Sequence, residues 1–207
     1  MHCKTDFPHT CGTNVTWLRS LIIIASIMLS ACAHSITITP ASTPQRSDNN
    51  LYSTKVVGYV MTDPDRARQV TTPGGGGDKV SYFPYRDLEK GIRDALRSLY
   101  SDVVLVSSAK DFAAIKRDGI AIVYTPEIYT SSDSDSMFTW PPTKFSIELV
   151  STASDSEGNF LAGLKVTGQG EASFSEFKQD FGLAGRRAAQ DALEKLIAEI
   201  RANPKLN

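Results

Sequence analysis

The sequence predicts an α+β fold: a single mixed, largely antiparallel sheet with two main helices packed on one face. Two long stretches, near residues 85–100 and 182–202, repeat hydrophobic residues at the 3.6-residue period of an α-helix. The segments before and between them are rich in β-branched and aromatic residues, and the last two of these segments alternate hydrophobic and polar positions. Because several strands follow one another directly between the two helices, the pattern favours an α+β arrangement over regular strand–helix alternation.

The composition suits one globular domain, which we expect at residues 53–203. The chain has 207 residues, 41% of them hydrophobic, and its 22 basic and 23 acidic side chains leave a net charge of −1. A chain of this length is long enough to bury one hydrophobic core. Nucleic-acid-binding proteins usually show a clustered excess of Lys and Arg, so we expect no nucleic-acid partner.

Residues 1–31 have the pattern of a secretory signal peptide. An apolar run over residues 21–29 follows Arg19. The run is shorter than the roughly 20 apolar residues of a membrane-spanning helix, but it has the length of the hydrophobic region of a signal. It ends in the motif Leu29-Ser30-Ala31-Cys32, in which small residues precede the cysteine. A buried helix with a chance cysteine is the alternative.

Residues 32–52 are expected to be a flexible tether between Cys32 and the domain. The segment is rich in Ser, Thr, Pro, Asn and Gln, and Pro40 and Pro44 interrupt it. A flexible chain of about 20 residues has a root-mean-square reach of roughly 25 Å. Residues 35–39 alternate like a strand, so a strand docked on the domain is the alternative.

The first expected elements of the domain are a strand at residues 54–61, a long loop, and a short strand at 79–83. The loop holds four consecutive glycines at 74–77. A phosphate-binding loop needs Gly-Lys-Ser/Thr at the start of a helix, and Asp78 interrupts that pattern, so a plain loop is expected. Pro84 then suits the start of the first main helix, whose buried stripe is Leu88, Ile92, Ala95, Leu96 and Leu99.

Three elements are expected between the first main helix and residue 130. The continuous apolar run at 102–106 is typical of a strand covered on both faces. A short helix within residues 107–118 and a strand at 120–129 follow, and Pro126 is expected to limit that strand.

An antiparallel hairpin is expected next, with strands that include residues 144–149 and 164–167 and a turn at 155–159. Gly168 and Gly170 share the apolar face of the second strand, which indicates either close packing of a helix or a bulge. The last helix carries charges of both signs on its outer face and ends before Pro204.

The positions of cysteine and histidine exclude several kinds of chemistry from the expected domain. The cysteines are Cys3, Cys11 and Cys32, and the histidines are His2, His9 and His34. All six precede residue 53, so we expect no Ser-His-Asp or Cys-His arrangement and no Cys/His zinc site there. We therefore predict no catalytic residue, no cofactor and no metal, and expect that the protein is not an enzyme.

The loop between the expected strand at 120–129 and the hairpin that follows it holds the candidate partner-binding residues. Met137, Phe138 and Trp140 lie in a loop that ends in prolines. Apolar side chains on a loop either fold back onto the core or form a surface for a partner. Asp133 and Asp135 provide too few carboxylates for a calcium loop of the EF-hand type.

The motif Leu29-Ser30-Ala31-Cys32 resembles the lipobox of bacterial lipoproteins. With the tether, the order of elements and the Ala/Leu-rich last helix, residues 29–202 resemble small periplasmic lipoproteins of proteobacteria. These are broadly the YajG and LpoB type, with a fold similar to the TolB amino-terminal domain. The resemblance implies that 1–31 is a lipoprotein signal peptide, that Cys32 carries a diacylglyceryl group and an acylated α-amine, and that the domain serves envelope machinery. Ala33 after Cys32 resembles the outer-membrane sorting pattern of enteric bacteria.

We therefore expect a non-catalytic lipoprotein, anchored to the bacterial outer membrane, facing the periplasm and binding another envelope protein. The alternative is a periplasmic carrier of a small ligand or lipid, with a pocket between sheet and helices near Gly168 and Gly170. A third hypothesis is an enzyme that uses Asp133, Asp135 or Glu148. Its acid and base would need a shared cleft and separated pKa values, and the sequence indicates neither.

Overall fold

The fold is described by a computed structural model that covers residues 33–45, 51–73, 79–134 and 143–207. Within these ranges, helices and strands combine in an α+β fold, as the sequence predicts. The strands form two sheets, however, and not the single sheet that was expected.

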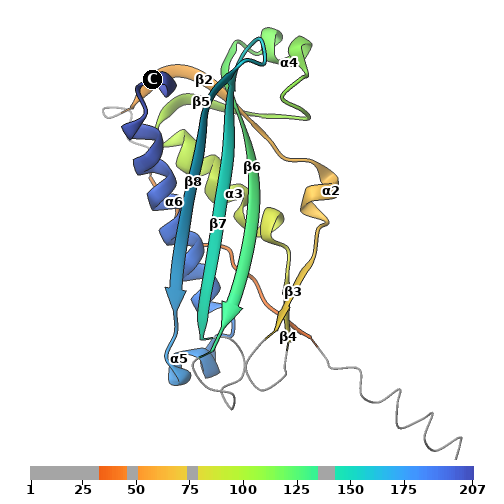
Figure 1. The fold of residues 1–207 in the computed structure, drawn as a ribbon, viewed down its shortest axis with the longest axis vertical. Coiled ribbons are helices and arrows are strands. Elements are labelled where there is room, and N and C mark those ends of the chain that lie inside the picture. The colour runs from red at the N-terminus through yellow and green to blue at the C-terminus, as the bar shows by residue number, and fades with distance from the viewer. Residues whose placement is uncertain (1–32, 46–50, 74–78, 135–142) are drawn as a thin grey trace, which may run out of the picture. The chain divides into compact units, whose positions relative to one another are not determined.

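The main sheet has five strands in the order β5-β2-β6-β7-β8 (Figure 1). β2 (Ser53–Val60) lies parallel to both β5 (Tyr100–Val106) and β6 (Ile120–Asp133). β6, β7 (Lys144–Asp155) and β8 (Phe160–Glu171) pair antiparallel and form the longest part of the sheet. The expected hairpin is therefore confirmed, whereas Pro126 does not end β6.

The second sheet has three short strands in the order β1-β4-β3. β1 (His34–Ser35) runs parallel to β4 (Lys79–Tyr82), and β3 (Val70–Pro73) runs antiparallel to it. This sheet meets β6 through side chains: two pairs of hydroxyl groups, each 2.6 Å apart, join Thr72 to Ser132 and Tyr82 to Thr130. The expectation of a single sheet is wrong because β4 pairs with β3 and β1, and it meets the main sheet through side chains, which include the rings of Tyr82 and Phe145 at 5.3 Å.

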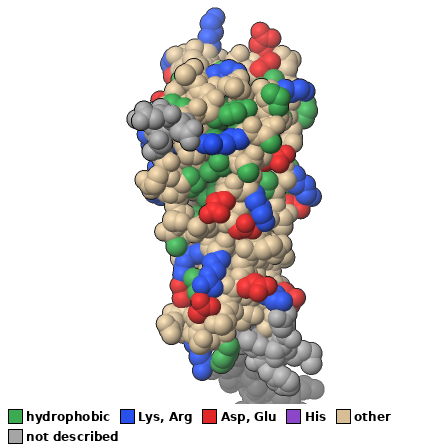
Figure 2. Space-filling model, turned by 90° about the vertical axis from the view of Figure 1, so that its left-hand side faces the viewer, with side chains coloured by type: hydrophobic (Ala, Val, Ile, Leu, Met, Phe, Trp, Pro, Cys, Tyr) green, Lys and Arg blue, Asp and Glu red, His purple; other side chains and the backbone are tan. Residues whose placement is uncertain are grey.

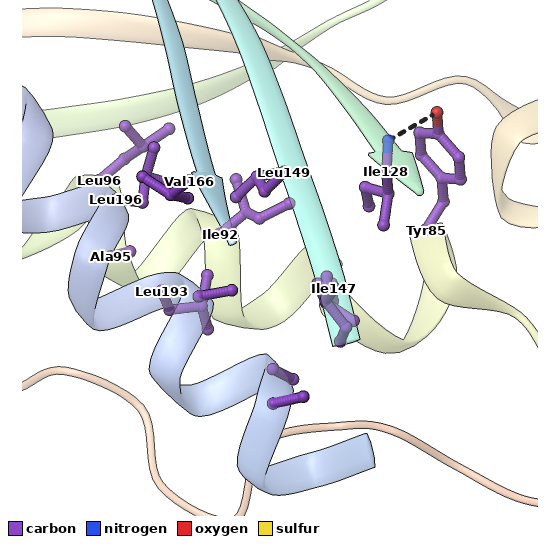
Figure 3. Close-up of a cluster of buried hydrophobic side chains, with 14 of the residues drawn as sticks. Tyr85, Ile92, Ala95, Leu96, Ile128, Ile147, Leu149, Val166, Leu193 and Leu196 are labelled. Atoms are coloured by element: carbon purple, nitrogen blue, oxygen red, sulfur yellow. Dashed lines mark hydrogen bonds between the residues drawn. The ribbon is translucent and has the colours of Figure 1, made fainter. Parts of the chain in front are cut away.

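Two main helices, α3 (Pro84–Arg97) and α6 (Leu183–Ala202), pack on one face of the main sheet, as predicted (Figure 1). The layer between helices and sheet is filled by buried aliphatic side chains, among them Ile92, Leu96, Leu149, Val166, Leu193 and Leu196 (Figure 3). Burial of each such side chain is worth about 1.5–3 kcal/mol, so this layer supplies the main attraction between helices and sheet.

The opposite face of the sheet is covered at one end by α4 (Phe112–Arg117). Ile122 belongs to the main core and its neighbour Val123 to a second, smaller cluster with Ile115 of α4, because successive residues of a strand point to opposite faces. β5 lies at the edge of the sheet, and Leu105 is 46% exposed. Val103 packs against the main core, whereas Val104 and Val106 pack in the smaller cluster, so the expected cover on both faces of this strand is present in part.

Two short helices were not predicted. α2 (Asp63–Arg66) follows β2, and α5 (Phe174–Gln179) follows β8. Each begins with a capping box, in which the first residue caps the backbone N–H of the third helical residue and that residue's carboxylate caps in return. The pairs Thr62–Asp65 and Ser173–Glu176 are the sequence signal that marks both helices.

The described part of the expected tether packs on the domain. We call residues 34–45 the N-terminal strap. Ile38 is fully buried, its backbone N–H donates to Asp87 Oδ2 of α3 at 3.1 Å, and its side chain lies against Gly185 of α6. Ile36 is also buried, because the alternation of residues 35–39 places both isoleucines on one side. The tether prediction is wrong for these residues, and the compact unit runs from Ala33 to Asn207 and not from residue 53 to 203.

Candidate functional site

The residues that the sequence singles out for attachment and partner binding lie outside the described residues. These are the lipobox residues Leu29, Ser30 and Ala31, the lipidation candidate Cys32, and the partner-binding candidates Met137, Phe138 and Trp140. The structure does describe the residues on either side. Ala33 begins the compact unit, and β6 and β7 end and begin close to the aromatic loop.

Two of the carboxylates proposed for catalysis, Asp133 and Glu148, lie too far apart to share a cleft. Asp133 is paired in register with Lys144, and Glu148 with Tyr129, so the two carboxylates stand four residues apart along the sheet. At about 3.4 Å per residue this separation is roughly 14 Å, too far for one acid–base pair. Glu148 also forms an ion pair of 2.8 Å with Lys165. Asp135 lies outside the described residues. Within the described ranges no three His, Cys, Asp or Glu side chains are grouped as metal ligands would be.

Two buried tyrosine hydroxyl groups lie next to the C-terminal residues. The hydroxyl of Tyr100 donates to the backbone oxygen of Leu206 at 2.8 Å and lies 2.7 Å from the hydroxyl of Tyr124. Leu206 belongs to the short 3₁₀-helix η3 (Pro204–Leu206). Burial raises the pKa of Tyr100 to about 12 and raises the pKa of Tyr124 as well, so both phenols stay protonated at neutral pH. These tyrosines therefore have a structural role: they fix η3 against the main sheet.

A second polar group joins α2 to α3. The guanidinium of Arg66 binds both carboxylate oxygens of Glu89, with Nε–Oε2 and Nη2–Oε1 distances of 2.8 and 2.6 Å. The hydrogen bonds from Arg66 lower the pKa of Glu89. Burial, followed by the charge of Glu89, raises the pKa of Tyr59, whose hydroxyl lies 3.4 Å from Glu89. This cluster therefore holds a charged carboxylate and a neutral phenol, and it positions α2.

The pocket that the carrier hypothesis requires is filled. A Cβ atom at Gly168 would overlap the backbone oxygen of Ala188, and one at Gly170 would overlap the backbone oxygen of Ala184. The backbone of α6 therefore rests directly on β8, which is the close packing that the two glycines indicate. No room for a ligand remains at this position.

A hollow lies at the opposite end of the domain from α5. It has a volume of about 650 Å³ and is lined by Phe112, Ile115, Lys116, Gly119, Ile120, Ala121, Ser156 and Glu157. The hollow lies between α4 and the turn from β7 to β8 and contains one cation and one carboxylate. Nothing in this lining selects a particular ligand.

The outer edge of β8 is covered by side chains of α6. Lys195 Nζ donates to the backbone oxygen of Thr167 at 2.8 Å, and Asp191 Oδ2 accepts the N–H of Gln169 at 2.8 Å. Arg187 donates in the same way to the backbone oxygen of Glu171 at 2.7 Å. Because these residues of α6 are four apart, they lie on one side of the helix, and each contacts a residue of β8 two positions from the next. These three edge groups, in the C-terminal half of β8, are thus occupied and do not offer hydrogen bonds to another strand.

Exposed aromatic side chains gather at the end of the domain that carries α5. Phe174 is 51% and Phe181 36% exposed, and both pack on the buried Phe177, with ring centroids 6.0 and 5.1 Å from it. The ring of His34 meets Phe181 edge-on at 5.8 Å. We call these four residues the α5 aromatic cluster. Lys178 Nζ lies 4.7 Å from the centre of the Phe174 ring. The cluster joins the first residues of the strap to the end of β8.

Charges of both signs are distributed along the face seen in Figure 2, and hydrophobic side chains reach the surface between them. In the part of the chain that the structure describes, no helix is both long and apolar enough to cross a bilayer.

Comparisons with known proteins find similarity only to solved structures, at low sequence identity. Neither the protein-family models nor the curated proteins contain a match. A crystal structure of a Xanthomonas campestris protein of the family DUF330 is 13% identical, with a TM-score of 0.45 over 82% of this chain and 91% of that chain. The dodecamer of a PelC variant from Paraburkholderia phytofirmans is also 13% identical, with a TM-score of 0.35 over 73% and 95%. At these TM-scores neither likeness indicates a function.

Proposed function

We propose that this chain is a bacterial lipoprotein, anchored through Cys32 to the outer membrane and facing the periplasm. There it acts without catalysis as a binding or assembly accessory of another envelope protein. The observation that carries this proposal is the start of the compact unit at Ala33, directly after Cys32. Cleavage between Ala31 and Cys32 would leave the whole folded unit, with one lipid-bearing residue ahead of it.

The finer likeness to the YajG and LpoB type of lipoprotein, and to the TolB amino-terminal domain, belongs to this proposal. It rests on the motif Leu29-Ser30-Ala31-Cys32 and on the order of the elements. A role without catalysis is supported by the polar groups described above, since Tyr100, Tyr124 and Glu89 all serve structural contacts.

Lipidation is tested by growing cells with an alkyne fatty acid and measuring incorporation into the protein. We expect labelling of the wild type and none of Cys32→Ser. Cys11→Ser is the matched control, because Cys11 would leave with the signal peptide and its replacement should not change labelling. Equal labelling of Cys32→Ser and wild type would contradict acylation at this residue, as would an unlabelled wild type.

Partner binding is tested by crosslinking intact envelopes and recovering the protein. We expect a specific crosslinked species with wild type that is weakened by Trp140→Ala. Phe160→Ala is the matched control, because Phe160 is a 69% exposed aromatic residue at the other end of β8. The partner role of the loop would be refuted if Trp140→Ala gave the wild-type pattern.

A further inference from the structure

The packed strap limits how far the domain can lie from a lipid on Cys32. β1 begins at His34, so only Ala33 separates Cys32 from a residue that is paired in a sheet. Two residues of fully extended chain span at most about 7 Å. A flexible tether over residues 32–52 would instead reach roughly 25 Å. The attachment point therefore lies beside β1.

β1 lies at the end of the domain where α5 is found. His34 pairs with Val80 in the second sheet and contacts Phe181, which follows α5. At the same end, the backbone N–H of Ala172, just before α5, donates to the oxygen of Thr143, just before β7, at 2.8 Å. Figure 1 shows α5 below the lower ends of β7 and β8, far from α4. A lipid on Cys32 would thus bring the α5 end close to the bilayer.

The α5 end has the surface that a bilayer interface favours. Phe174 and Phe181 expose apolar rings, and Lys178 extends over Phe174 with a long aliphatic chain and a charged tip. Phe on one side with Lys nearby is typical of segments that lie in the headgroup region, where the cation reaches the polar layer. Hydrophobic atoms are visible at the lower end of the face shown in Figure 2.

Ion pairs hold this surface in place and neutralise its acidic groups. Arg187 Nη2 lies 2.8 Å from Glu176 Oε1, and Arg186 pairs with Asp180. Ser173 caps α5 together with Glu176. The cluster therefore lies on an element with a fixed position. The arginines neutralise the charges of Glu176 and Asp180, which reduces their repulsion from anionic headgroups.

We infer that the α5 end rests on the bilayer, with the rings of Phe174 and Phe181 in the headgroup region, so that the anchored domain keeps one orientation. This inference rests on the proposed lipidation of Cys32. Acyl chains on Cys32 supply most of the affinity, since each CH₂ group that they bury in the bilayer adds to it, and the aromatic rings set the orientation. The occupant is the lipid surface; a protein bound to Phe174 is the competing outcome.

The test uses the acylated mature chain, purified from membranes and reconstituted into vesicles of phosphatidylethanolamine and phosphatidylglycerol. The sequence has no cysteine after Cys32, and the sulfur of Cys32 would carry the lipid. A thiol introduced into the mature chain can therefore be labelled alone. An NBD fluorophore is placed at Ser175→Cys on α5 or, as the matched control, at Ser156→Cys in the turn between β7 and β8. Both serines are exposed, and they lie at opposite ends of the domain.

We expect lipids with a nitroxide near the headgroup to quench most of the emission from position 175 and little from position 156. Phe174→Ser should weaken the quenching at 175, whereas Phe160→Ser, which removes an exposed ring at the other end, should not. Equal quenching at both positions, or none at 175, would overturn the orientation, and protection of 175 by a co-purified protein would do the same. An intact mass without acyl chains would overturn the proposed lipidation instead, and the two failures are thereby distinguished.

Discussion

Two glycines of β8 determine how closely α6 approaches the main sheet. A methyl group at Gly168 would overlap the backbone of α6 at Ala188 and Ala192. We expect Gly168→Ala to destabilise the domain by about 1–3 kcal/mol or more, because the helix must move away from its well-packed position. Urea unfolding of a fragment of residues 33–207 measures this change in the free energy of unfolding.

Gly163→Ala is the control on the same strand. A Cβ atom at Gly163 would meet nothing closer than 3.8 Å, which is an ordinary contact. Its free energy of unfolding should stay close to the wild-type value. If Gly168→Ala unfolded at the same urea concentration as Gly163→Ala, the close approach of α6 would be disproved.

The Glu176–Arg187 pair makes stability depend on acid pH. Hydrogen bonds from Arg187 first, and then from Ser173, lower the pKa of Glu176 from 4.5 to about 2. A carboxylate with a lowered pKa in the folded state stabilises the protein above its unfolded pKa, and this contribution is lost as the pH falls. We therefore expect the wild type to lose more stability than Glu176→Gln between about pH 5 and pH 2.

Circular dichroism melts at several pH values measure this difference. Gln at position 176 preserves the capping box, so the comparison isolates the charge. Parallel pH profiles of the two proteins would show that the pair has no such effect.

Single residues also explain why α5 and its cluster were not predicted. The capping pair Ser173–Glu176 is visible in the sequence, but six residues are too few for a hydrophobic period to be recognised. His34 and Phe181 meet only after the strap has returned across the fold. No local pattern indicates such a contact.

The N-terminal strap is an element of the domain, and Ile38 is its main anchor. Ile38 is fully buried between α3 and α6. We expect Ile38→Ala to cost about 2–5 kcal/mol of the free energy of unfolding, as for other aliphatic residues truncated in a core. Urea unfolding measures this cost, and hydrogen exchange of residues 36–40 reports local release.

Thr37→Ala is the control for the strap, because the side chain of Thr37 is exposed and bonds only to its neighbour Thr39 in the contacts described. It should be nearly neutral. A free tether would predict equal stability for Ile38→Ala and Thr37→Ala, together with rapid exchange of residues 36–40, and that result would refute the strap.

The side chains of α6 bind backbone groups along the C-terminal half of the β8 edge. We expect the double variant Asp191→Ala/Lys195→Ala to associate more readily, because it uncovers backbone groups of Thr167 and Gln169. Analytical ultracentrifugation over a range of concentrations measures association. Glu194→Ala/Glu199→Ala changes exposed residues of the same helix and should behave as wild type. If both double variants associated equally, protection of the edge would not explain the contacts.

The long elements could be predicted because they carry a repeated period. α3, α6 and the β7–β8 hairpin lie where their hydrophobic patterns indicate. The second sheet could not be predicted, because its strands are only two to four residues long and β1 pairs with β4 across more than 40 residues of sequence. For the strap, the alternation of residues 35–39 was the correct signal, and the nearby prolines suggested a tether instead.

At the scale of the whole molecule, a domain whose α5 end rests on the bilayer would present its surfaces to a partner in one fixed orientation. β6 ends and β7 begins at the α5 end, and the partner-binding candidates Met137, Phe138 and Trp140 stand between these two strands in the sequence. A partner bound through these residues would lie close to the bilayer, while the hollow beside α4 would face away from the membrane. The sequence alone suggests attachment at Cys32, but the orientation follows only from the packed strap.

The central claim is that Cys32 is the acylated first residue of the mature protein. Mass spectrometry of the protein isolated from its native membrane tests this most directly. We expect an N-terminal peptide that begins at Cys32 and carries a diacylglyceryl group and an acyl chain. A mature protein that retains residues 1–31, or that has an unmodified Cys32, would contradict the account.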